Sequence, residues 1–342
     1  MESDLFSSLD TNAYRKTERY FIEQYLLKMS YRTPMGYGYL PSQRFNIDRE
    51  IDEDGFQSHR FDDTAEWCGF FSGSTGWGWG IPQKSQMIDY ALAKRMGVNM
   101  RNYANVGVNL YKIYTLFEQL SIAGKLPKKN IVYFGINEGY DTANNRSLFT
   151  SMRDARIAKK IRHFENYYRN IAHDTGYLCY EAARSVALRV LDVKNAFGKG
   201  FVERMPAQKA TKTLDEAVYR ENFRIITEIV RRMRQRSPET IFVLEPSLFD
   251  KEHPTPYERK LLEKKRWSDN LLETTLTRLY DDLSLFFEKE GVVYVDARRS
   301  LDGVREPLYF DYCHPYTEAS KMIGRFVGER IGGGMDYAEE KR

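Results

Sequence analysis

Four short motifs in this chain contain the residue types that are needed to cleave a carboxylic ester. They are spread over more than two hundred residues: Ser72–Gly76, Gly107, Gly135–Asn137 and Asp311–Pro315. Ester cleavage needs an activated hydroxyl, a base that titrates near neutral pH, a group that orients this base, and donors for the oxyanion. Each motif is common by chance, so the prediction rests on their combination and order.

Ser74 and His314 are the candidates for the hydroxyl and the base. Small neighbours around Ser74 let a substrate approach its Oγ. Of the five histidines, only His314 has a carboxylate, Asp311, three residues before it and a proline after it. A turn brings such positions together, so Asp311 could accept the Nδ1–H and leave Nε2 facing Ser74. Pro315 suits the first position of a following helix, which would place His314 at that helix's amino end.

Neither residue would be singled out alone. A serine between glycines is usually only a turn, and a lone histidine is usually a surface or capping residue. The apolar runs in the sequence show where these motifs lie relative to the expected strands and helices. Runs typical of buried strands precede the motifs at residues 68–71, 100–104, 131–134 and 292–295. Helical patterns lie between these runs at residues 84–96, 110–122 and 219–233.

Strands that alternate with helices predict an α/β protein with a parallel sheet covered on both faces. Ligands bind outside the carboxyl ends of the strands in such sheets. We therefore expect all four motifs at one edge of the sheet.

With these motifs in this order, the chain resembles the SGNH, or GDSL-like, hydrolase superfamily. The closest branch has a first block of the form Gly-Gly-Ser-Thr-Thr-x-Gly, which here is Ser72–Gly78 and differs at its first glycine and second threonine. The resemblance covers roughly residues 50–333 and implies a three-layer, flavodoxin-like α/β/α sandwich. Its sheet would be mainly parallel, with about five strands and helical insertions.

The later blocks match in the same order. Gly107 matches the glycine of the second block, and Gly135–Glu138 matches Gly-x-Asn-Asp with Glu138 in place of the aspartate. Asp311 and His314 match Asp-x-x-His, and Asp54–Ser58 resembles the Gly-Phe-Arg stretch that often precedes the first block. The resemblance implies that Ser74 is the nucleophile. It also implies an oxyanion hole formed by the backbone N–H groups of Ser74 and Gly107 and the side-chain amide of Asn137.

The implied activity is that of a serine ester hydrolase that works through an acyl-enzyme. O-Acetyl esters of sugars or small metabolites fit the family. Acyl transfer to an acceptor hydroxyl is the alternative, and a non-catalytic binding module on the same fold is a second one. Trp77 and Trp79 follow the nucleophile and could line an acyl or sugar subsite, although core packing explains at least one of them equally well.

Other enzyme classes fit less well. Gly76–Gly80 has the wrong spacing for a dinucleotide loop and contains two tryptophans. An α/β-hydrolase elbow requires glycine where Ser72 stands. Since no P-loop, His-Glu-x-x-His or paired Cys-x-x-Cys motif is present, we expect neither a metal nor another cofactor.

Composition narrows the partners and the compartment. A net charge of +4 and an isoelectric point near 8.7 are too mild to argue for nucleic-acid binding. Three scattered cysteines, at 68, 179 and 313, suggest a reducing compartment. Met1–Thr17 has no apolar signal core, and no run approaches the ~20 apolar residues of a membrane span. We expect a soluble cytoplasmic protein that acts on a small-molecule or carbohydrate ester.

The domain organisation is expected to have three parts. Residues 1–65 form an amino-terminal extension that packs on the core, residues 66–333 form the hydrolase domain, and residues 334–342 form a flexible tail. A mainly helical insert at about 140–215 is expected either to cap the site or to form the interface of a homo-oligomer.

Overall fold

The computed structural model describes residues 30–32, 36–38, 51–52, 54–81, 83–148, 213–263 and 267–332. The chain divides into two compact units, residues 1–149 with 214–342 and residues 150–213, and only the first is described below. Three predicted features lie outside the described residues: the packing of residues 1–50, nearly all of the insert, and the tail at 334–342. Within residues 1–50 the structure describes one short antiparallel pair, β1 (Ser30–Arg32) with β2 (Gly36–Gly38).

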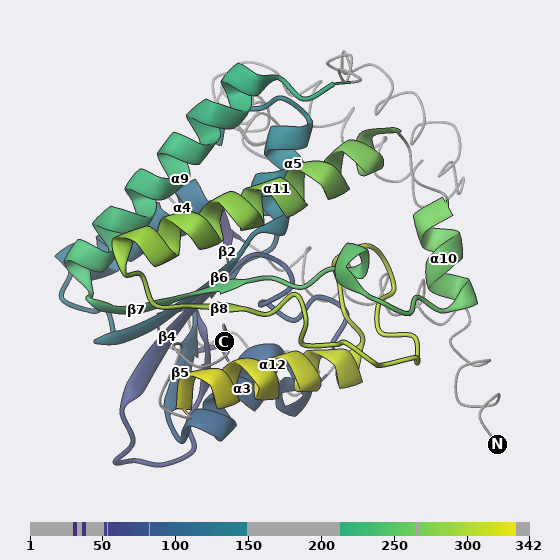
Figure 1. The fold of residues 1–342 in the computed structure, drawn as a ribbon. Coiled ribbons are helices and arrows are strands. Elements are labelled where there is room, and N and C mark those ends of the chain that lie inside the picture. Colours follow the sequence, from purple (N-terminus) through teal and green to yellow (C-terminus); the bar gives the residue numbers. More distant parts are fainter. Residues whose placement is uncertain are drawn as a thin grey trace, which may run out of the picture. The chain divides into compact units, whose positions relative to one another are not determined.

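A six-stranded sheet forms the centre of the first unit (Figure 1). Its order is β3-β5-β4-β6-β7-β8, and all neighbouring pairs are parallel except β3 with β5. The strands are β3 (Gln57–His59), β4 (Trp67–Ser72), β5 (Asn99–Asn102), β6 (Lys129–Phe134), β7 (Glu239–Leu244) and β8 (Tyr294–Asp296). The predicted mainly parallel sheet is thus confirmed, with one antiparallel edge strand in addition.

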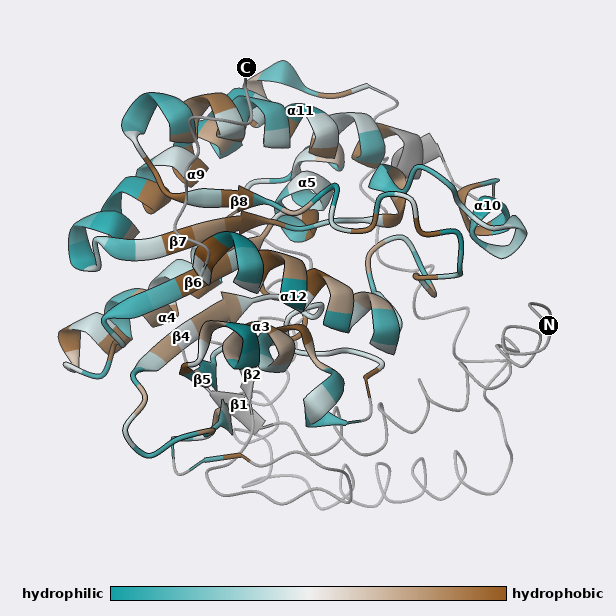
Figure 2. Cartoon of the chain, turned by 60° about the horizontal axis from the view of Figure 1, so that its bottom comes forward, coloured by the Kyte–Doolittle hydropathy of each residue, from teal (hydrophilic) through white to brown (hydrophobic). Residues whose placement is uncertain are grey.

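Helices cover both faces of this sheet. On one face lie α4 (Leu110–Ile122), α9 (Glu216–Arg236) and α11 (Trp267–Glu290), and on the other lie α3 (Ile88–Met96) and α12 (Thr317–Gly332). Alternation along β6 explains the two layers, because Val132 packs with the first group of helices and Ile131 with the second. The central strands are largely hydrophobic, whereas the flanking helices alternate in hydropathy (Figure 2). The predicted three-layer α/β/α sandwich is confirmed.

Short elements connect the strand ends to the outer helices. They are η2 (Lys84–Gln86), α5 (Ile136–Ala143), η3 (Leu248–Asp250) and α10 (Pro256–Glu263). The predicted helix at 110–122 has the same bounds as α4, whose first turn is capped by the side chain of Asn109. The predicted helix at 84–96 is instead η2 followed by α3.

Among the described residues, no helix has the length and apolar character needed to cross a membrane.

A close approach of α3 and α12 depends on Gly324. A Cβ added at Gly324 would lie 2.4 Å from the carbonyl oxygen of Ile88 and 2.8 Å from the Cβ of Ala91. The first of these atoms belongs to a helix backbone, so the helices would have to separate to admit a methyl group.

We therefore expect Gly324→Ala to lower the free energy of unfolding by about 1–3 kcal/mol, as overpacking does. Urea denaturation followed by circular dichroism measures this change. Gly332→Ala on the same helix is the matched control, since nothing lies within 4 Å of the added Cβ there. Equal stability of the two variants would contradict the packing argument.

Candidate active site

Ser74 lies in the tight turn that follows β4. The Trp77 N–H donates to the Gly73 carbonyl at 3.0 Å, and the Trp79 N–H donates to the Ser74 carbonyl at 3.0 Å. These bonds fold the chain back at the carboxyl end of the strand. They leave Ser74 partly exposed at the edge of the sheet.

A continuous chain of hydrogen bonds joins Ser74, His314 and Asp311. Ser74 Oγ is 2.8 Å from His314 Nε2, and His314 Nδ1 is 2.7 Å from Asp311 Oδ2. A carboxylate only accepts hydrogen bonds, so Nδ1 carries a proton and, in the neutral imidazole, Nε2 accepts the hydroxyl proton of Ser74. The structure thus brings together three predicted residues that are up to 240 positions apart.

Asp311 is held by its own turn. Its Oδ1 accepts the backbone N–H groups of Cys313 at 2.8 Å and His314 at 2.7 Å, while Oδ2 accepts the imidazole. Burial favours a higher pKa for Asp311, but the charge of His314 and these hydrogen bonds outweigh it and lower the pKa. The carboxylate is therefore ionised and available to orient the ring.

The helix expected at Pro315 begins later. Pro315 forms an antiparallel bridge with Tyr309, and α12 begins only at Thr317. The prediction that Pro315 occupies the first helical position was wrong. The bridge to Tyr309, six residues earlier in the same loop, keeps Pro315 out of the first helical turn.

Asn137 joins three of the four motifs. It is the second residue of α5, and its Nδ2 donates to the Val108 carbonyl at 2.6 Å. A Cβ added at Gly73 would lie 2.7 Å from the same Nδ2, so the amide lies against the backbone just before Ser74. The amide carries a second hydrogen that a ligand oxygen can accept. Gly107, next to Val108, has a φ of 67°, a conformation that favours glycine.

Glu138 stabilises the loops that carry Gly107 and Asn137. It is fully buried, and its carboxylate accepts the N–H of Leu110 at 2.5 Å and the N–H of Gly135 at 3.0 Å. Burial raises its pKa to about 7, even though the backbone hydrogen bonds act in the opposite direction. Glu138, which stands where the resembled motif has aspartate, thus joins the start of α4 to the start of α5.

The two tryptophans occupy different environments. Trp77 is only 1% exposed and belongs to the core, so it does not line the site. The ring of Trp79 lies 6.4 Å from that of His314 and is partly exposed. Phe310, which sequence analysis missed, stacks on the imidazole with centroids 5.6 Å apart and an angle of 8°.

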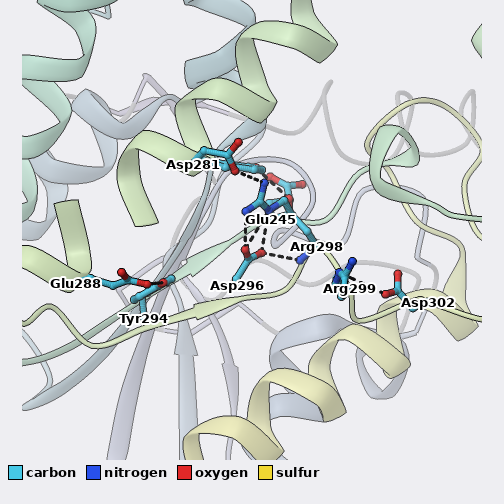
Figure 3. Close-up of polar contacts among 9 residues, drawn as sticks. Glu245, Asp281, Glu288, Tyr294, Asp296, Arg298, Arg299 and Asp302 are labelled. Atoms are coloured by element: carbon cyan, nitrogen blue, oxygen red, sulfur yellow. Dashed lines mark hydrogen bonds and ion pairs between the residues drawn. The ribbon is translucent and has the colours of Figure 1, made fainter. Parts of the chain in front are cut away.

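A further residue that sequence analysis missed is Glu245, the first residue after β7. Its side chain is buried and interacts with the Thr75 side chain and the Ile136 N–H, beside Ser74 and Asn137. Its backbone carbonyl accepts Tyr280 Oη at 2.9 Å. Figure 3 shows Glu245 near Arg298, which pairs with Asp296 and Asp281. The sequence signal that could have identified Glu245 is a single carboxylate directly after the apolar run of β7.

Metal binding can be tested against the same residues. Within the described part of the chain, Asp311, Cys313 and His314 place one candidate ligand atom each within 4.8 Å of one another. The hydrogen bond between the imidazole and Asp311 accounts for this proximity. Burial raises the pKa of the Cys313 thiol well above its usual range, which is the opposite of what a thiolate ligand requires. The donor set therefore fits a metal poorly.

No family model matches the chain, and no curated protein matches it in sequence. Several solved structures are similar to it. A lipolytic protein of the G-D-S-L family from Veillonella parvula is 8% identical, with a TM-score of 0.46 over 79% of this chain and 99% of that one. The acetylxylan esterase Axe2 from Geobacillus stearothermophilus is 10% identical, with a TM-score of 0.41 over 80% and 97%.

The contact between Gly73 and Asn137 leads to a specific expectation. Gly73→Ala would push the Asn137 amide out of place. On the predicted role of this amide as an oxyanion donor, we expect kcat to fall toward the loss of about 10²–10³-fold that removal of one such donor causes. Ester hydrolysis by Gly73→Ala and Asn137→Ala, measured side by side, tests this. Wild-type kcat in a folded Gly73→Ala protein would show that the amide position is unimportant.

Glu245 should make stability depend on pH. Burial raises its pKa from 4.5 to about 7, so between these values the folded state holds a proton that the unfolded state has released. The free energy of unfolding therefore falls as the pH rises through this window. We expect Glu245→Gln to flatten that fall by on the order of 1–3 kcal/mol.

Urea denaturation at several pH values between 4.5 and 7.5 measures the slope. The exposed Glu239→Gln, at the start of the same strand, serves as the control and should leave the slope unchanged. An identical slope in wild type and Glu245→Gln would contradict the expectation.

Proposed function

We propose that this protein is a serine ester hydrolase that forms an acyl-enzyme on Ser74. The observation that carries the proposal is the hydrogen-bond chain from Ser74 Oγ through His314 to Asp311, with distances of 2.8 and 2.7 Å. In this series of hydrogen bonds, the hydroxyl, both imidazole nitrogens and the carboxylate each have the partner that nucleophilic catalysis requires. A turn or a surface histidine with no catalytic role would not require that order of partners.

In the first half-reaction, Ser74 Oγ attacks the ester carbonyl while His314 Nε2 takes the hydroxyl proton. Asp311 accepts the Nδ1–H and stabilises the imidazolium that forms. The tetrahedral intermediate then expels the alcohol, which takes the proton from Nε2. The products are a free alcohol and an acyl group bound to Ser74.

In the second half-reaction, a water molecule attacks the acyl-enzyme while His314 accepts one of its protons. Collapse of the second tetrahedral intermediate returns this proton to Ser74 Oγ and releases the carboxylic acid. The base is thereby restored to its neutral form.

The oxyanion of both intermediates needs fixed donors. The side-chain amide of Asn137 and the backbone N–H groups of Ser74 and Gly107 fit this role. The close approach of Asn137 to Gly73 and its hydrogen bond to the Val108 carbonyl support it. Such donors are effective because they are already oriented before charge develops.

The substrate is a carboxylic ester, and we favour a short acyl group, such as acetyl, on a sugar or a small metabolite. Trp79 and Phe310 support a compact acyl site because their rings lie beside the imidazole. A panel of p-nitrophenyl esters of increasing acyl length should show the highest kcat/KM for the shortest acyl groups. Product analysis with added alcohols distinguishes hydrolysis from acyl transfer.

Labelling with a fluorophosphonate tests the nucleophile directly. We expect the wild type to incorporate one probe per chain and Ser74→Ala to incorporate none, because the probe reacts with an activated serine hydroxyl. Intact-protein mass spectrometry measures the incorporation. The proposal fails if the folded wild type is not labelled, or if Ser74→Ala is labelled equally.

A further inference from the structure

The loop that carries Asp311 and His314 has a narrow base. Between Leu308 and Tyr316 the chain turns back on itself. The Tyr316 N–H donates to the Leu308 carbonyl at 2.7 Å, and the Phe310 N–H donates to the His314 carbonyl at 3.2 Å. The position of this base therefore sets the position of the residues at the tip.

A buried carboxylate from another element holds that base. Glu258 Oε1 accepts the N–H of Leu308 at 2.7 Å and the N–H of Tyr309 at 3.2 Å. These two donors lie three and two residues before Asp311. A second contact comes from the neighbouring residue, because Tyr257 Oη donates to the Phe310 carbonyl at 3.4 Å.

The other oxygen of Glu258 serves its own helix and a buried cation. Oε2 accepts the N–H of Thr255 at 2.8 Å, as in a capping box at the start of α10. The same atom is 2.6 Å from Lys251 Nζ, which also donates to the Glu306 carbonyl. The two side chains are 0% and 1% exposed, respectively.

A helix cap alone does not explain this arrangement. A capping box uses one carboxylate oxygen and works well at an exposed helix start, whereas burying an ion pair carries a large desolvation cost. Here the buried pair joins three segments: the chain after η3, the start of α10, and the stretch that leads into the loop. Loss of the Glu258 carboxylate would remove the acceptor of two backbone donors at the base.

We propose that Glu258, paired with Lys251, is a positioning residue that fixes the base of the 308–316 loop and thereby holds His314 within reach of Ser74. This proposal rests on the function proposed above. Glu258 touches neither substrate nor reacting atoms. Its effect is therefore expected on the rate of attack by Ser74 rather than on substrate binding.

The experiment measures the second-order rate constant and the final extent of fluorophosphonate labelling in Glu258→Leu, after circular dichroism has shown that the variant is folded. We expect the rate constant and kcat for an ester to fall by about 10- to 100-fold, as a misplacement near 1 Å does, with KM within about threefold. The final extent should remain one probe per chain. A merely structural role would instead lower the extent, through unfolded molecules, and leave the rate of the folded ones unchanged.

Glu318→Gln is the matched control, because it breaks an exposed pair with Lys321 on α12 just after the same loop. It should label at the wild-type rate. If Glu258→Leu does not fold, Glu258→Asp decides, since it keeps the charge opposite Lys251 but its carboxylate is one methylene shorter. We then expect labelling to be slowed by about 3- to 10-fold.

A wild-type rate constant in folded Glu258→Leu, or in Glu258→Asp where that variant decides, would overturn the positioning role. Failure of the proposed function would look different, because the wild type itself would then not be labelled.

Discussion

The imidazole of His314 must meet Ser74 and Asp311 at the same time, and the rest of the site is arranged around this requirement. Asp311 is near in sequence, so one turn supplies that contact. Ser74 is 240 residues away and belongs to a different strand end. Hydrogen bonds weaken steeply with distance and angle, so the loops at this sheet edge must be held within a fraction of an ångström.

Buried glutamates provide much of that rigidity. Glu138 binds backbone N–H groups at the start of α4 and α5, Glu245 lies between the Ser74 turn and α5, and Glu258 holds the base of the 308–316 loop. Loops that are packed into a protein need acceptors for their N–H groups, which no strand or helix supplies. A carboxylate can serve two loops at once, which explains why such costly groups occur where several loops meet.

The regular parts of the fold were largely predictable from sequence. The helix at 110–122 has strong apolar periodicity and a capping Asn109, and its bounds agree with α4. The runs at 68–71 and 131–134 are continuous and apolar because β4 and β6 are central parallel strands, buried on both faces. Pro315 shows the limit of this approach, since its bridge to Tyr309 overrides a local helix signal. Trp77 and Trp79 show another limit, because two identical residues in one turn, separated by a single glycine, differ in burial.

The sequence by itself determined the alternation of strands and helices and the candidate residues Ser74, Asn137, Asp311 and His314, because these depend on local pattern and residue type. Tertiary structure alone decided that the amide of Asn137 lies against Gly73 and that Glu258 reaches the loop. These contacts join residues that are far apart in the chain. Their distances depend on how strands pack side by side in the sheet, which no local pattern encodes.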